Sequence, residues 1–183
     1  MLTLAVGAAV AVHTAFAFAT DLASRRIPNL WNIAAAAAGM VVHGAAGGWK
    51  GWAASAAGCA VLFAVTFALQ LAGAIGGGDA KWFAALGSWT GAAFAFHTLL
   101  NAVLAAGLMA LVHFLWKGTW RNVARRWTAA AWLALSARSA VPVGAARSLA
   151  ERKEMPFMIA VLPAVIVTAW QWEGSGRTWW TVF

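Results

Sequence analysis

Charged residues are scarce in this chain. They make up 10% of its 183 residues, whereas 63% of the residues are hydrophobic, and a soluble domain usually contains roughly 25% charged residues. A helix needs about 20 apolar residues to cross a hydrocarbon core of about 30 Å, and several stretches of that kind occur. The composition therefore argues against a soluble fold and predicts an all-α membrane protein.

Cysteine occurs once, as Cys59, so neither an internal disulfide nor a CxxC metal site can form. The first 24 residues contain no Lys or Arg, so the apolar N-terminus lacks the basic region of a cleaved signal peptide. The four histidines lie in apolar stretches at irregular spacing, which suits buried residues bonded to the backbone better than proton relays or metal ligands. We therefore expect a retained first span, no metal and no cofactor.

Six apolar stretches predict a bundle of six transmembrane helices, forming one membrane domain over residues 1–183. The expected spans are 2–20, 30–46, 52–75, 80–91, 97–116 and 155–172. A turn within 90–96 is expected between the fourth span and the fifth. Tryptophans favour the headgroup level of a bilayer, and eight of them lie near the expected span ends: Trp31, Trp49, Trp52, Trp82, Trp116, Trp120, Trp170 and Trp172.

The basic residues indicate the orientation in the membrane. With both termini outside, the cytoplasmic connections contain Arg25, Arg26, Lys81 and the eight basic residues of 117–153, which is eleven of the thirteen. Only Lys50 and Arg177 then lie outside. Because Lys and Arg are enriched in cytoplasmic loops, this topology is favoured over its inverse.

The connection 117–153 is basic and only partly apolar. Between 120 and 135, apolar residues recur at helical spacing while the arginines lie on other faces. This pattern predicts a basic amphipathic helix on the cytoplasmic surface, bound to anionic lipid or serving as a docking surface for a substrate or partner. The formal charge of +8 is thus assigned to the membrane, since no polar domain gathers it for nucleic acid.

Two of the five acidic residues, Asp21 and Asp79, lie where an expected span meets the cytoplasm. Ionisable groups beside a span are functional candidates because they are expensive to place there. Two neighbouring carboxyls cannot both ionise easily, so one keeps a proton while the other activates water, which is aspartic-protease chemistry. As alternatives, Asp79 caps a helix after three glycines, and Asp21 caps a helix or pairs with Arg25.

Two short segments resemble the aspartate motifs of bacterial prepilin peptidases. Residues 21–29, Asp-Leu-Ala-Ser-Arg-Arg-Ile-Pro-Asn, resemble the first motif, in which Asp precedes an Ile-Pro-Asn turn. Residues 76–81, Gly-Gly-Gly-Asp-Ala-Lys, resemble the second and match the GxGD signature shared with presenilin-like and preflagellin peptidases. Two expected spans separate the motifs, as in that family, and Met-Pro-Phe at 155–157 also resembles the opening of its final span.

The resemblance implies that Asp21 and Asp79 are a catalytic pair that cleaves the basic leader of type IV prepilins or pseudopilins at the cytoplasmic face of the bacterial inner membrane. It implies no cofactor. Residues implied to support the site are Arg25, Arg26, Pro28, Asn29, Gly76, Gly77, Gly78 and Lys81. Larger members carry paired CxxC motifs in a methylating domain, so this chain resembles the short Flp/Tad-pilus type.

Two other classes of function stay open on the residues alone. A proton-coupled or small-solute transporter should distribute polar groups toward the bilayer midplane, whereas here they gather at one face. A non-catalytic assembly subunit of a pilus or secretion system would use its aspartates as helix caps only. Asparagine replacements would then be silent.

Overall fold

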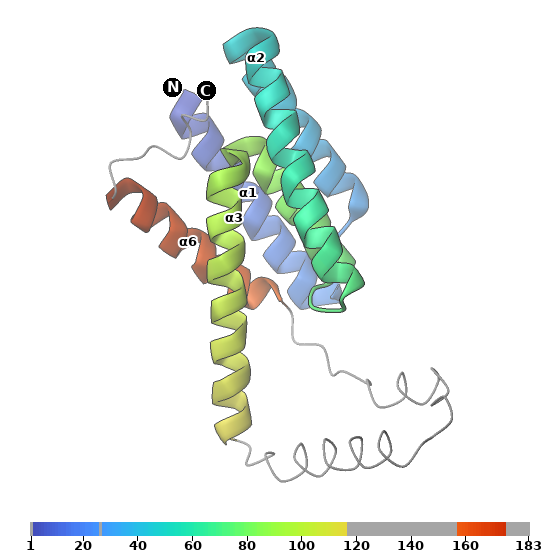
Figure 1. The fold of residues 1–183 in the computed structure, drawn as a ribbon, viewed down its shortest axis with the longest axis vertical. Coiled ribbons are helices and arrows are strands. Elements are labelled where there is room, and N and C mark those ends of the chain that lie inside the picture. Colours follow the sequence, from blue (N-terminus) through green and yellow to red (C-terminus); the bar gives the residue numbers. More distant parts are fainter. Residues whose placement is uncertain (1, 26, 117–156, 175–183) are drawn as a thin grey trace, which may run out of the picture. The chain divides into compact units, whose positions relative to one another are not determined.

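The computed structural model describes residues 2–25, 27–116 and 157–174, and its elements there are helices (Figure 1). They are α1 (Leu2–Ser24), α2 (Asn29–Leu71), α3 (Gly77–Trp116) and α6 (Met158–Gly174). Helices α1, α2 and α3 are long and apolar enough to cross a membrane, and α6 is a shorter apolar helix. The predicted all-α architecture is confirmed.

The chain divides into two compact units, residues 1–106 with 156–183 and residues 107–155. In the second unit only the end of α3 is described. The fold and the site below belong to the first unit.

Helix α2 folds back on itself at Gly48, where φ is 62° and ψ is −147°, a conformation that glycine adopts most readily. The Nε2 atom of His43 lies 2.9 Å from the carbonyl oxygen of Trp89, and the Ser55 hydroxyl donates to that of Ser88 at 2.7 Å. A straight helix would hold positions 43 and 55 about 18 Å apart, yet they contact consecutive residues of α3. Figure 1 shows the resulting hairpin.

Helix α3 bends sharply at Gly91, where φ is 77° and ψ is 167°, and its ribbon turns there in Figure 1. This break lies within the turn expected at 90–96. The segment before it, 77–90, becomes the centre of the unit, because every residue from 82 to 91 is buried.

The core forms around this central segment. Its largest members include Trp82, Phe83 and Leu86, which are fully buried. Helix α1 packs against α6, and both contribute apolar side chains to the same cluster, including Val6 and Val161. Many other large apolar side chains point outward, as expected for helices surrounded by lipid tails. The central segment carries Asp79 near its start, so this core positions the candidate site.

The tryptophans follow the interface pattern only in part. Trp49 and Trp52 stack at 4.9 Å beside the Gly48 turn and are exposed, and Trp170 is exposed on α6. The prediction for Trp82 is wrong, because this side chain is fully buried in the core. Trp82 belongs to a helix enclosed on all sides, and a position near a span end does not reveal that enclosure. Trp120 lies outside the described residues.

Several predicted boundaries shift by about one turn. Helix α1 continues to Ser24, so Asp21 lies in its last turn instead of beyond a span ending at 20. Helix α2 ends at Leu71 before the expected limit of 75, and α3 begins at Gly77 before the expected 80. The cytoplasmic segment 117–153, its amphipathic helix and the start of the last span at 155–156 lie outside the described residues.

Candidate active site

Asp21 is fixed at the junction of α1 and α6. Its side chain is only 8% exposed, and its Oδ2 atom accepts a hydrogen bond from the backbone N–H of Met158 at 3.3 Å. The first N–H groups of a helix have no partner within the helix, so this carboxyl satisfies one at the start of α6. The Asp21 carbonyl also accepts from the N–H of Arg25 at 2.9 Å, and Arg25 ends the helix with a φ of 52°.

Asp79 lies in the first turn of α3 and is also 8% exposed. Its Oδ2 atom accepts from the N–H of Gly76 at 3.2 Å, while the Gly76 carbonyl accepts from the N–H of Ala80 at 3.1 Å. The Asp79 carboxyl thus satisfies the N–H at the start of the helix, which is one half of a capping box, and the helix dipole favours negative charge there. The bond from Gly76 therefore takes the place of the N-cap role that the sequence left open for Asp79, because Asp79 is the third residue of α3. It orients the carboxyl and does not oppose a catalytic role.

The two motifs meet through residues that follow Asp21. A Cβ placed on Gly78 would lie 3.6 Å from the Cβ of Ile27. The Nζ atom of Lys81 donates to the Oδ1 atom of Asn29 at 2.8 Å. The chain just after Asp21 thus packs against the chain around Asp79.

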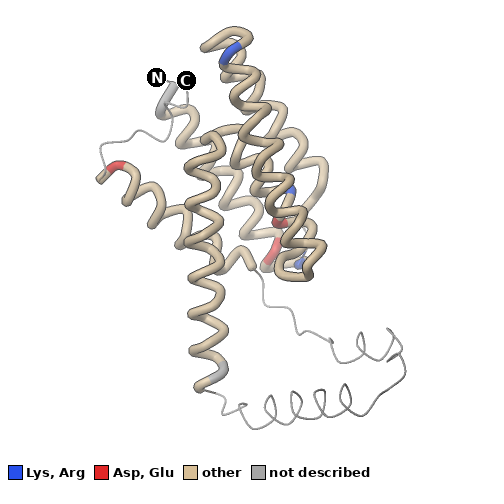
Figure 2. Tube along the Cα trace, viewed as in Figure 1, with Lys and Arg blue, Asp and Glu red and all other residues tan. Residues whose placement is uncertain are grey.

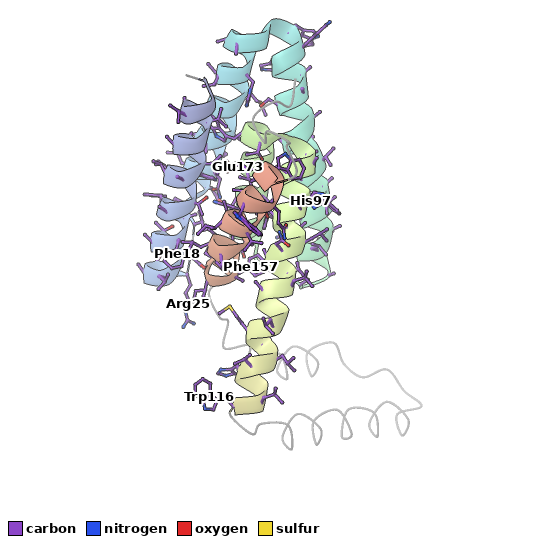
Figure 3. All side chains as sticks on the ribbon, turned by 90° about the vertical axis from the view of Figure 1, so that its left-hand side faces the viewer. Phe18, Arg25, His97, Trp116, Phe157 and Glu173 are labelled. Carbon is purple, nitrogen blue, oxygen red and sulfur yellow. The ribbon has the colours of Figure 1, made fainter. Side chains whose placement is uncertain are left out.

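The figures place these groups at one end of the first unit. In the view of Figure 2 the acidic positions of α1 and α3 lie at the same end of the unit, and the acidic position of α6 lies away from them. In Figure 3, Arg25 and Phe157 lie at that same end, and Glu173 lies at the opposite end of α6. Glu173 is therefore separated from this end of the unit by the length of α6.

The three glycines before Asp79 leave room for neighbouring side chains. Their backbone angles are ones that other residues can also adopt. None of them has a positive φ, whereas Gly73 in the same connection has a φ of 73° and makes the turn. A Cβ on Gly76 would lie 2.9 Å from the Oδ2 atom of Asp79, and one on Gly77 would lie 3.0 Å from the Nε2 atom of Gln70. The sequence analysis missed Gly73, which no motif singles out.

Gly76→Ala is expected to slow the cleavage that the resemblance implies by about 10- to 100-fold, because misplacing a reacting group by about 1 Å can cost about 10²-fold. The added methyl group would displace the Asp79 carboxyl, which can rotate away at little cost in stability. Gly78→Ala is the matched control, since its methyl group would make only an ordinary contact with Ile27. Cleavage rates and thermal unfolding of both variants test this, and equal rates would contradict it.

The other residues implied by the resemblance occupy distinct places. Pro28 is the N-cap of α2, with a φ of −59° and a ψ of 128°; proline suits a helix start because no N–H is needed there. Asn29 and Lys81 form the hydrogen bond that joins the motifs. Arg25 is exposed, and Arg26 lies outside the described residues.

Sequence reasoning missed Asn32, which is 2% exposed and donates from Nδ2 to the Gly78 carbonyl at 3.4 Å. The sequence does offer one indication of its role, since Asn32 is an amide within an apolar stretch. It also lies three residues after Asn29, which places both on the same face of a helix. In the ranges that the structure describes, no three His, Cys, Asp or Glu side chains gather as a metal ion would require.

These features define a class: a helical membrane protein with two buried aspartates held by backbone N–H groups at one end of the bundle. The sequence model of the type IV leader peptidase family matches residues 8–111, more than half of the chain and both motifs. The chain belongs to the type IV leader peptidase family, which confirms the resemblance and makes the protein a membrane peptidase. No curated protein and no solved structure matches it.

Proposed function

We propose that this peptidase uses Asp21 and Asp79 to remove the leader peptide from Flp-type prepilins or pseudopilins. The packing of the two aspartate motifs against each other, through Ile27 on Gly78 and Asn29 on Lys81, carries the proposal. It supports a shared site because Asp79 is adjacent in sequence to Gly78 and two residues from Lys81, and because Ile27 and Asn29 belong to the same short motif as Asp21. Both carboxyls are largely buried, which strengthens electrostatic interactions.

In the proposed reaction, the ionised carboxyl takes a proton from a water molecule, whose oxygen attacks the carbonyl carbon of the scissile peptide bond. The protonated carboxyl hydrogen-bonds to the carbonyl oxygen, where charge develops. A proton then passes to the amide nitrogen as the carbon–nitrogen bond breaks. The N–H groups of Met158 and Gly76 orient the two carboxyls before substrate arrives.

The proposed setting is the inner membrane, with six spans, both termini outside and the site at the cytoplasmic face. Helix α1, the two segments of α2, the two segments of α3, and α6 supply six apolar segments in the described chain. Arg25 and Lys81 flank the site, whereas Lys50 lies by the Gly48 turn. This separation supports the orientation favoured by the basic residues. The segment 77–90 is about 20 Å long, less than a full bilayer core.

The basic segment 117–153 is proposed to lie on the cytoplasmic surface as part of a single domain with the spans. Its supporting observation is its charge, which anionic lipid headgroups would attract.

The buried hydroxyl groups do not support the alternative that this protein is a transporter. Thr14, Thr90 and Thr98 each donate to the carbonyl four residues earlier in the same helix. Such hydroxyls are already satisfied locally and do not mark a polar path through the bundle.

The purified full chain in lipid bilayers is expected to cut an Flp-type prepilin once, between the basic leader and the apolar segment. Mass spectrometry of the products gives the cut position and reports any methyl group added to the new N-terminus. A prepilin with an altered cleavage junction is the control substrate. The proposal fails if the intact prepilin persists under conditions in which another leader peptidase cleaves it.

A further inference from the structure

Five buried polar atoms gather near the candidate site without a hydrogen-bond partner among the described residues. They are both ring nitrogens of His13, Nε1 of Trp31, Oδ1 of Asn32 and Nε1 of Trp82. The side chains of His13, Asn32 and Trp82 are at most 3% exposed. Buried polar groups in native proteins are nearly always paired, so such a concentration calls for a physical cause.

His13, Trp31 and Trp82 form a ring cluster where α1, α2 and α3 meet. The His13 ring lies between two indoles, with ring centroids 6.3 Å from Trp31 and 5.7 Å from Trp82. The main chain of Trp82 lies close enough to the His13 ring to interact as a weak hydrogen-bond partner, but neither ring nitrogen makes a hydrogen bond of full geometry. Asn32 adjoins this cluster along both helices, because it follows Trp31 in α2 and donates to the Gly78 carbonyl one helical turn before Trp82.

The cluster is close to both aspartates along the helices that carry them. His13 and Asp21 are two turns apart on one face of α1, with the fully buried Ala17 between them. Trp82 follows Asp79 by three residues, so both lie on neighbouring positions of one face of α3. The cluster therefore adjoins the first turn of α3, where Asn32 bonds to the Gly78 carbonyl.

The unpaired donors and acceptors of these side chains indicate which ligand would fit. The two indoles offer N–H donors only, neutral histidine offers one donor and one acceptor, and the Asn32 oxygen is an acceptor. A water molecule, which both donates and accepts, is the small ligand that complements this mixture. A peptide group would not reach the polar atoms of His13, Asn32 and Trp82, because these side chains are at most 3% exposed, whereas Trp31 is half-buried at the edge.

We propose that His13, Trp31, Asn32 and Trp82 enclose a site for ordered internal water that holds the start of α3, with Asp79, against α1 and α2. Water occupancy does not depend on the proposed function. The effect on catalysis does rest on it.

Water-edited solid-state NMR of the full chain in lipid bilayers, with 15N-labelled tryptophan, tests occupancy directly. Magnetisation from water is expected to reach the Trp82 indole faster than that of Trp89, which is 7% exposed but donates to the Ala35 carbonyl at 2.8 Å. Trp82→Phe and Trp89→Phe assign the two signals. Equal, slow transfer to both indoles would overturn the water site.

His13→Phe keeps the aromatic stack and removes both ring nitrogens. It is expected to slow water transfer to Trp82 and to lower kcat by about tenfold with KM unchanged, while His13→Gln restores part of the rate. A His13→Phe enzyme with full kcat, or with a higher unfolding temperature and unchanged water transfer, would overturn the positioning role. A wild-type protein that cleaves no prepilin would refute the proposed function instead, while the NMR comparison still decides occupancy.

Discussion

Asp21→Asn and Asp79→Asn are each expected to slow leader cleavage by about 10²- to 10⁴-fold, the usual contribution of a general acid or base. Asparagine has nearly the same volume, and its carbonyl oxygen can still accept from the N–H of Met158 or Gly76. It can neither ionise nor deliver a proton at the required step. The two variants therefore remove the chemistry while keeping the contacts that orient each side chain.

The rates should be measured with saturating prepilin in the same lipid, alongside thermal unfolding of each variant. Glu173→Gln is the matched control, because this carboxyl is exposed and lies at the opposite end of α6 from the site. Its rate is expected to equal that of the wild type. Full activity in either aspartate variant would refute the pair.

The sequence was sufficient for the all-α architecture, the family and the location of the turns in α2 and α3. Helix content follows from long apolar stretches, and the turns coincide with Gly48 and Gly91, whose backbone angles disfavour other residues. The two aspartate motifs are local, so their residues can be recognised without a fold. The catalytic roles of Asp21 and Asp79 stay predictions.

What the sequence could not provide depends on contacts between helices. Asp21 accepts a hydrogen bond from the backbone N–H of Met158, and no pattern of side chains in the sequence predicts a backbone partner. The amide of Asn32 is assigned to the site only once α2 is placed against the Gly78 carbonyl. Trp82 was assigned to the interface because the sequence shows how close it is to a span end. The sequence does not show that other helices enclose the helix that carries it.

Gly58→Ala is expected to be strongly destabilising, because α2 and α3 touch there through their backbones. A Cβ on Gly58 would meet the carbonyl oxygen of Gly87 and lie 3.2 Å from the Cα of Gly91. A Cβ on Gly87 would in turn lie 2.9 Å from the carbonyl carbon of Gly58. Small residues allow such close approach in membrane helices, and a backbone atom cannot rotate out of the way.

The helices would have to separate, and overpacking of this kind costs about 1–3 kcal/mol. Thermal unfolding followed by tryptophan fluorescence measures the loss, with Gly107→Ala on α3 as control because a Cβ there meets nothing within 4 Å. Gly58→Ala and Gly87→Ala together should cost less than their sum, because one separation accommodates both methyl groups. Strict additivity, or a Gly58→Ala unfolding temperature equal to that of Gly107→Ala, would show that this contact does not hold α3 in place.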